Sequence, residues 1–332
     1  MASAEFDVTG IGNAIVDVIA HADDAFLAAN GIEKGAMTLI DAARAEELYG
    51  RMGPGVEMSG GSAGNTMAGI ASLGGKGAYI GKVHSDQLGQ VFRHDIRATG
   101  VHFETAAGQG GTPTARCLIL VTPDAQRSMN TYLGACVELG PEDIDEALIA
   151  NSQVTYLEGY LWDPPRAKEA FRKAAAIAHG AGRKVSLSLS DSFCVHRHHA
   201  EFLDLVENHV DILFANEHEI GALYKTDRFE DALEAVKRLG KVAALTRSEK
   251  GAVIVSGGEV VEVPAAPVER VVDTTGAGDL YASGFLYGYT RGLSPVVCGR
   301  LGAVAAAEII SHVGARPEVT LAGLVTEKGI LA

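Results

Sequence analysis

Short apolar runs rich in β-branched residues alternate with helix-like stretches through most of this 332-residue chain. These runs predict strands near residues 8–12, 78–83, 117–121, 154–157, 185–189, 212–214, 242–245 and 252–255. Helical patterns lie between many of them, for example over residues 166–181, 229–239, 277–289 and 295–311. This order indicates parallel βαβ units with right-handed crossovers, so we expect an α/β fold with a mainly parallel central sheet.

Two segments fit that alternation poorly. Residues 16–41 and 105–133 contain additional strand-like runs and glycine turns. Extra strands in an α/β fold commonly cover a site at the carboxyl ends of the main strands, so we expect these segments to form a small β-rich lid. An ordinary extension of the sheet edge is the alternative. We find no linker and expect one domain over residues 1–332, with a β-hairpin at residues 251–264.

The net charge excludes some classes of partner. The formal charge is −14, which disfavours binding to nucleic acid or to anionic membrane surfaces. The first residues lack the basic and apolar regions of a secretory signal, and the four cysteines show no CxxC pair. We expect a cytoplasmic protein, monomeric or homodimeric, whose partners are small molecules.

The most specific motif is Asp-Thr-Thr-Gly-Ala-Gly-Asp at residues 273–279, directly before a predicted helix. Gly276, Ala277 and Gly278 would direct backbone N–H groups and the positive end of the helix dipole towards one point, which forms an anion hole. Asp279 would stand beside this hole, where a general base could accept a hydroxyl proton during phosphoryl transfer. A glycine-rich turn followed by a helix-start carboxylate is the alternative.

Polar residues near the first strand predict a site for a polyhydroxylated substrate. Asn13 and Asp17 follow that strand, and an ionised Asp can accept two hydrogen bonds from a cis-diol. Gly60 and Gly61 would let a substrate approach the backbone, and Asn65 would offer a two-sided amide. The alternative for Asn13 and Asp17 is turn chemistry.

These motifs resemble the signatures of the ribokinase/phosphofructokinase-B carbohydrate kinases. The C-terminal signature lies at residues 273–285, and the N-terminal one at residues 60–65, 71–75, 79–83 and 86–89. The resemblance implies a three-layer α/β/α fold and an ATP-dependent kinase. It assigns the diol to Asp17 and extends the substrate site to Ser62.

The resemblance also implies the nucleotide site. Asn216 and Glu219 match an Asn-x-x-Glu motif that organises Mg²⁺ and phosphate, with Glu219 acting through water, although Asn216 could instead be only an N-cap. The further residues expected near ATP are Thr246, Arg247, Gly251, Thr275, Gly276 and Gly278. Ser248 stands where the family usually has glycine. A weaker expectation is a K⁺ ion near Asp273 and Thr275, closed by carbonyls near Gly314.

Several segments resemble the adenosine kinases within this family, among them residues 12–17, 113–117 and 127–135. The resemblance places Leu133 and Ala135 against the nucleoside. With Ile15, Leu39 and Tyr160 they would form an apolar slot for a purine. Arg127 would approach the transferring phosphate when the lid closes.

Other substrates and another class of protein stay open. The substrate alternatives are guanosine, inosine, or the sugars of ribokinase, fructokinase or 2-keto-3-deoxygluconate kinase, and the other class is a catalytically silent sensor. The histidine-rich run 196–199 predicts a solvated helix start rather than a metal site, and Trp162 fits either a substrate platform or the core.

Overall fold

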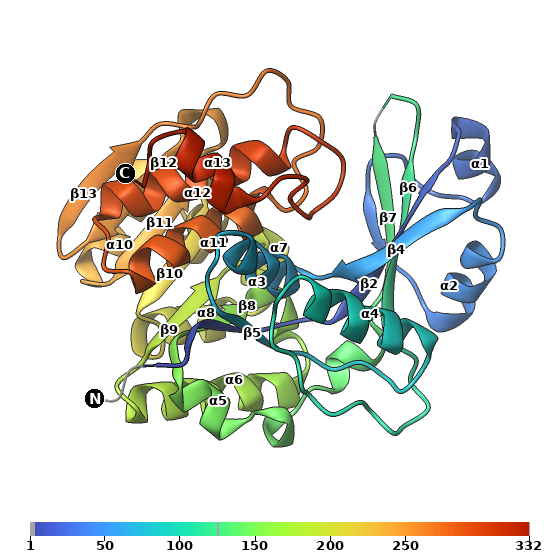
Figure 1. Ribbon diagram of the computed structural model, residues 1–332, viewed down its shortest axis with the longest axis horizontal. Coiled ribbons are helices and arrows are strands. Elements are labelled where there is room, and N and C mark those ends of the chain that lie inside the picture. The colour runs from blue at the N-terminus through green and yellow to red at the C-terminus, as the bar shows by residue number, and fades with distance from the viewer. Residues whose placement is uncertain (1–3, 125, 332) are drawn as a thin grey trace.

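The computed structural model describes residues 4–124 and 126–331, and its strands form two sheets (Figure 1). The main sheet has eight strands in the order β13-β12-β11-β10-β9-β8-β1-β5. Their bounds are β1 (Phe6–Ile11), β5 (Gly77–Ile80), β8 (Ser152–Glu158), β9 (Lys184–Ser188), β10 (Ile212–Asn216), β11 (Val242–Thr246), β12 (Ala252–Ser256) and β13 (Glu259–Val263). The strands from β5 to β11 pair in parallel, and β12 and β13 form the predicted hairpin at one edge.

Helices cover both faces of the main sheet, which confirms the three-layer prediction. Along β10, Leu213 packs into the core on one face, and Phe214 packs into the core on the other. The first face is covered by α5 (Glu146–Ala150), α6 (Pro165–Gly180), α7 (Ser192–Arg197), α8 (His199–Asn208), α9 (Glu217–Tyr224) and α10 (Phe229–Arg238). The opposite face holds α3 (Ser62–Ser72), α4 (Gln87–Ala98), α11 (Ala277–Thr290) and α12 (Pro295–Ile309), with α13 (Leu321–Glu327) packed against α3 and α12.

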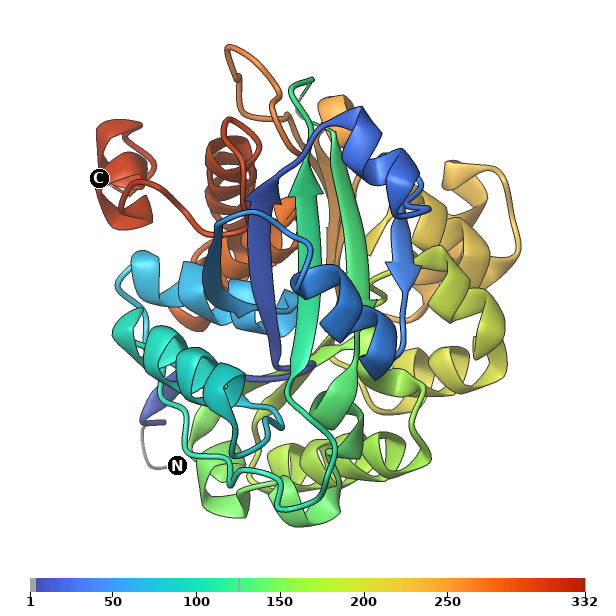
Figure 2. The same ribbon diagram turned by 90° about the vertical axis from the view of Figure 1, so that its right-hand side faces the viewer.

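The second sheet stands across one end of the main body, and Figure 2 views it face on. Its order is β3-β7-β6-β2-β4, with β2 (Ile15–His21), β3 (Met37–Leu39), β4 (Gly55–Gly60), β6 (Ala115–Val121) and β7 (Arg127–Tyr132). The helices α1 (Asp24–Ala29) and α2 (Ala42–Tyr49) lie on its outer side in Figure 1. Alternate residues of β2 point to the outer side of the second sheet. Two of them, Val18 and Ala20, pack there into clusters of buried apolar side chains.

The second sheet differs in two ways from the segments expected for it. The strand β4 lies outside both segments, yet it pairs with β2 along its whole length. Residues 105–114 contain no strand of this sheet, and Gly108 forms a bridge with His84 of the main body instead. Short 3₁₀ turns connect several elements: η1 (Gly134–Glu138), η2 (Pro141–Asp143), η3 (Gly159–Trp162) and η4 (Ser248–Lys250).

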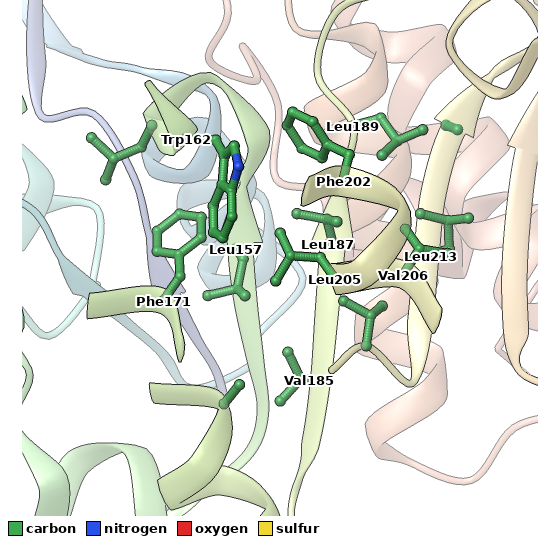
Figure 3. Close-up of a cluster of buried hydrophobic side chains, with 14 of the residues drawn as sticks. Leu157, Trp162, Phe171, Val185, Leu187, Leu189, Phe202, Leu205, Val206 and Leu213 are labelled. Atoms are coloured by element: carbon green, nitrogen blue, oxygen red, sulfur yellow. The ribbon is translucent and has the colours of Figure 1, made fainter. Parts of the chain in front are cut away.

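Two features that the sequence left open, one residue and one short run, have structural roles. Trp162 is fully buried, and its ring packs near those of Phe171 and Phe202 in the core (Figure 3), so it is no substrate platform. The histidine-rich run spans the junction of α7 and α8, where His198 contacts Asp163. Within the described ranges, no helix is long and apolar enough to cross a membrane.

Candidate active site

The predicted site residues gather at the carboxyl edge of the main sheet. Asn13 follows β1, Asn216 ends β10, and Thr246 ends β11. Because Asn216 and Thr246 are register partners in adjacent parallel strands, the two nucleotide candidates lie side by side. Ligands in open α/β sheets bind at this edge, which makes it the candidate active site.

Asp279 lies in the first turn of α11 and is held by two side chains of α3. The Ser62 hydroxyl donates to its Oδ1 at 2.6 Å, and the Asn65 amide donates to its Oδ2 at 3.0 Å. Ser62 and Asn65 were predicted as substrate ligands, and the structure brings them to the predicted base. Two hydrogen bonds to one carboxylate fix its orientation.

The start of α11 has the features of an anion hole. Gly276 precedes the helix with a φ of +78°, a left-handed conformation that favours glycine. The N–H groups of Gly278 and Asp279 make no hydrogen bond within the described residues, because the first helical bond runs from Leu280 to Gly276. A Cβ added at Gly278 would meet nothing within 4 Å, so the space beside this glycine is open. An anion can approach these N–H groups closely.

Opposing effects act on the pKa of Asp279. Burial raises this pKa, while the hydrogen bonds from Ser62 and Asn65 and the positive charge of Arg316 lower it. The net shift is upward from the ordinary value. A carboxylate with a raised pKa is a better proton acceptor, which suits a general base.

The glycine pair makes room for the protein's own polar groups. A Cβ at Gly60 would stand 2.3 Å from Oδ2 of Asp17, and one at Gly61 would stand 2.0 Å from the carbonyl oxygen of Asn13. The pair therefore seats the Asp17 carboxylate and the Asn13 backbone, which the sequence argument had not foreseen. Burial raises the pKa of Asp17 to about 6, against the lowering effects of Arg316 and Arg127.

Glu158, which sequence reasoning did not select, organises the floor of the site. Its Oε1 accepts from the Asn13 amide at 2.7 Å and its Oε2 from the Ala63 N–H at 2.8 Å. Burial raises its pKa to about 7. The sequence feature that could have predicted this role is the position of Glu158, an acidic residue at the end of an apolar strand. Asn65 Oδ1 is a buried acceptor without a hydrogen-bond partner in the described chain.

An apolar hollow of about 300 Å³ adjoins the second sheet. Leu39 and Leu133, both predicted for the purine slot, line it together with Ile40, Thr112, Thr131, Tyr132, Gly134 and Val137. Ala135, also predicted to lie against the nucleoside, is fully buried and does not line the hollow, so its contact with a ligand stays a prediction. Ile15 packs within the second sheet, and Tyr160 is exposed but does not line this hollow.

A second hollow, of about 510 Å³, contains none of the predicted site residues. Its lining is mixed in polarity and in charge: Lys82, Gly108, Gln109, Val137, Glu138, Glu142, Pro164, Pro165 and Arg166. Its charged groups of both signs do not converge on a ligand of one chemistry.

Asn216 and Glu219 form a capping box at the start of α9. The Asn216 amide donates to Glu219 Oε1 at 2.6 Å, and the Asn216 backbone N–H donates to Oε2 at 2.9 Å. The N-cap alternative therefore holds, but it does not exclude a metal role. Burial, together with the negative charges of Asp191 and Asp279, raises the pKa of Glu219 to about 7. A divalent cation would relieve this unfavourable accumulation of charge.

The loop after β11 is closed by a backbone hydrogen bond and has Ser248 where the family motif usually has glycine. Ser248 adopts a φ of +51°, and Gly251 a φ of +86°. The Arg247 N–H donates to the Gly251 carbonyl at 2.7 Å, which closes the loop. The guanidinium of Arg247 stacks 3.9 Å from the Phe229 ring centroid and contacts Glu217. Its charge is therefore already engaged by protein groups.

The Asp273 carboxylate is fully engaged by donors. Oδ1 accepts from the Thr275 N–H at 3.0 Å and its hydroxyl at 2.8 Å, and Oδ2 accepts from the Gly314 N–H at 3.2 Å and from the Arg127 guanidinium. This arrangement fits the expected K⁺ ion poorly, because Arg127 already supplies the positive charge. Arg127 thus ties the second sheet to the anion-hole segment.

The geometry does not bring together a direct ligand set for a metal. Among residues 4–124 and 126–331, no three His, Cys, Asp or Glu side chains are placed to hold an ion. Mg²⁺ usually retains several waters in phosphate-transfer sites, so a single carboxylate such as Glu219 is a suitable partner.

Comparison with known proteins agrees with this geometry. A sequence model described as pfkB family carbohydrate kinase matches residues 35–321. The crystal structure of adenosine kinase from Sinorhizobium meliloti is 61% identical, with a TM-score of 0.90 and coverage of 98% of this chain and 100% of that one. A probable sugar kinase protein from Rhizobium etli CFN 42 is 57% identical, with a TM-score of 0.91 and coverage of 99% and 100%. Adenosine kinase 1 of Arabidopsis thaliana is 28% identical, covering 95% of this chain and 97% of its own length.

Proposed function

The chain belongs to the pfkB family of carbohydrate kinases, and we propose that it transfers the γ-phosphoryl group of ATP to the 5′-hydroxyl of adenosine. The observation that carries the proposal is Asp279, gripped by Ser62 and Asn65 beside unpaired N–H groups of α11. We take residues 1–332 as one domain whose second sheet acts as a lid.

The reaction follows from this arrangement. The Asp279 carboxylate accepts the proton of the nucleoside's 5′-hydroxyl group. At the same time the 5′-oxygen forms a bond to the γ-phosphorus. The bond between that phosphorus and the β,γ-bridging oxygen breaks, and ADP leaves. The free N–H groups at Gly278 and Asp279 stabilise the charge on the phosphoryl oxygens. In such a loose transition state the proton leaves late, which a carboxylate base tolerates.

The ribose site is built from three elements. The Asp17 carboxylate, from β2, would accept hydrogen bonds from the 2′- and 3′-hydroxyls. The free Oδ1 of Asn65, from α3, would accept one more hydroxyl. Asn13, fixed by Glu158, closes the floor. These contacts would place the 5′-hydroxyl towards Asp279.

The apolar hollow favours a nucleoside over a free sugar. Leu39 and Leu133 offer a hydrophobic surface for a purine ring, which a plain sugar would leave uncovered. Water would enter that space beside a sugar, whereas a base would exclude it.

The ATP site is proposed at the ends of β10 and β11. Thr246, Arg247 and Gly251 would neighbour the nucleotide, while Thr275, Gly276 and Gly278 would surround its transferred phosphate. Glu219 would hold Mg²⁺ through water, and the ion would neutralise phosphate charge. A cytoplasmic location belongs to the same proposal, since the four cysteines are free thiols.

A phosphotransfer screen tests the proposal. The purified protein with Mg-ATP is offered adenosine, inosine, guanosine, ribose, fructose and 2-keto-3-deoxygluconate, and ADP release is measured. We expect the highest kcat/KM for adenosine. A higher value for ribose or fructose would make the protein a sugar kinase, and no turnover with any of them would favour a silent sensor.

A further inference from the structure

Arg316 occupies a central position between the lid and the candidate base. It lies in the loop between α12 and α13, and its guanidinium reaches into the body of the molecule. Nη1 donates to the Gly64 carbonyl at 2.8 Å, and Nη2 donates to the Ser59 carbonyl at 2.7 Å and to its hydroxyl at 2.8 Å. Nε donates to the same Ser59 carbonyl at 3.2 Å. One side chain thus binds two separate elements.

Those two elements meet where the proposed lid joins the main body, a junction called the hinge below. Ser59 is near the end of β4, and the chain passes through Gly60 and Gly61 into α3. Gly64 lies in the first turn of α3, between Ser62 and Asn65, the two residues that hold Asp279. A shift of β4 relative to α3 would therefore be transmitted to the base.

The charge of Arg316 is not neutralised by an ion pair. All its hydrogen-bond partners are neutral, and among the described residues it forms no ion pair with a carboxylate. Three carboxylates lie further away and still interact with the charge: Asp17, Asp95 and Asp279. Asp95 anchors the other side of the hinge, accepting from the Ser59 N–H at 2.8 Å.

We propose that Arg316 is a positioning residue that locks β4 to α3 and supplies the positive charge between the diol-binding Asp17 and the base Asp279. The inference rests on the proposed function, since it assumes the roles of those two carboxylates. Arginine suits this task because its fork can donate to Ser59 and Gly64 at once and stays charged.

The charge and the geometry can be separated by substitution. Arg316→Lys keeps the charge, but one ammonium group cannot reproduce the fork between Ser59 and Gly64. Arg316→Gln removes the charge and keeps a hydrogen-bonding side chain. The matched control is Arg291→Gln, at the far end of α11, where Arg291 contacts Asp7 and the Tyr287 ring.

The charge predicts a displacement of the pH profile. The hydrogen bonds from Ser62 and Asn65, and then the positive charge of Arg316, lower the pKa of Asp279 against the raising effect of burial. Asp279 also interacts electrostatically with three carboxyls on other elements. Those groups are Asp17 on β2, Glu158 on β8 and Glu219 on α9. The neutral phenols of Tyr156 and Tyr160 also interact with Asp279. Loss of the cation should therefore move the acidic fall in kcat to higher pH.

The test measures kcat and KM for adenosine between pH 5 and 9, with amide exchange over residues 57–66 in the absence of ligand. We expect Arg316→Gln to shift the acidic limb upward, and Arg316→Lys to leave the limb in place but lower kcat by roughly tenfold. Exchange should accelerate in both variants and not in Arg291→Gln.

Two results would overturn the inference. One is an unshifted acidic limb in Arg316→Gln, and the other is unchanged exchange over residues 57–66 in both variants. If Arg316→Gln fails to fold, the kcat and exchange of Arg316→Lys decide the matter. Failure of the wild-type protein to phosphorylate adenosine would refute the proposed function separately, because exchange at the hinge is measured without substrate.

Discussion

Asp279 is held in a fixed orientation, so its replacement should affect chemistry rather than folding. In Asp279→Asn the amide can still interact with Ser62 but cannot accept the substrate proton. We expect kcat to fall by roughly 10²- to 10⁴-fold, as for the loss of a general base, with adenosine affinity nearly unchanged. Steady-state kinetics and calorimetric binding check this, and turnover close to wild type would exclude Asp279 as the base.

Asp17 should act mainly on binding. Its carboxylate would grip the diol equally in the ground state and the transition state, and such uniform binding appears in KM. We expect Asp17→Ala to raise KM for adenosine by at least about tenfold, while kcat changes less. 2′-Deoxyadenosine, which lacks one diol hydroxyl, should lose less from the substitution. An equal loss for both nucleosides would remove the diol role.

Two positions in the loop after β11, Ser248 and Gly251, should respond differently to substitution. Ser248→Gly relieves a left-handed φ but loosens the unfolded chain, so we expect the free energy of unfolding to change by less than about 0.5 kcal/mol. Gly251→Ala places a Cβ 2.1 Å from the Val263 carbonyl, which should cost about 1–3 kcal/mol. Denaturant unfolding measures the free energy of unfolding of both variants. If the two variants are equally stable, the loop is not strained.

At the scale of elements, periodicity predicted the main sheet because its strands are buried on both faces and its helices are long. The strand β4 was missed because Gly55–Gly60 begins and ends with glycine and is exposed at its start, so it lacks a strand-like apolar run. The signature predicted Gly60 and Gly61 as site residues. It could not predict that Gly60 leaves room for the Asp17 carboxylate, because this follows only from tertiary packing.

The ion pair between Arg127 and Asp273 joins the lid to the anion-hole segment. Removing it in Arg127→Ala should lower kcat by roughly 10- to 100-fold with a smaller change in KM, because small displacements of reacting groups cost rate on this scale.

Wild-type turnover should be similar in potassium, sodium and choline buffers, since Arg127 supplies the charge at Asp273. In Arg127→Ala, potassium should stimulate. Potassium activation of the wild type would contradict this account.

At the scale of the whole molecule, buried acids should make stability depend on pH. Burial raises the pKa of Glu158 and of Glu219 to about 7, above their values in the unfolded chain. The folded state therefore holds their protons more tightly, so stability falls as pH rises from about 4.5 to 7. We expect the Tm of the ligand-free protein to decrease over that window.

A variant isolates the contribution of Glu158. Glu158→Gln cannot ionise, so its Tm should fall less steeply with pH than that of the wild type. The matched control, Glu249→Gln, changes an exposed acid and should leave the slope unaltered. A wild-type slope in Glu158→Gln would show that this carboxyl does not titrate in the window.

The sequence predicted the family, the architecture and the residues of the anion hole, since these are written in contiguous motifs. It could not predict Glu158 or Arg316, because their roles arise from contacts between segments far apart in the chain. Nor could it predict that the Arg127 guanidinium contacts Asp273, the residue at which a K⁺ ion was expected.

Product analysis tests the central claim most directly. The protein is incubated with Mg-ATP and adenosine, and with 5′-deoxyadenosine as the matched substrate that lacks the acceptor hydroxyl. Phosphorus NMR then identifies the phosphorylated position. The account predicts AMP phosphorylated on the 5′-oxygen, formed in equal amount to ADP, and no product from 5′-deoxyadenosine. Phosphate on the 2′- or 3′-oxygen, or transfer to 5′-deoxyadenosine, would contradict it.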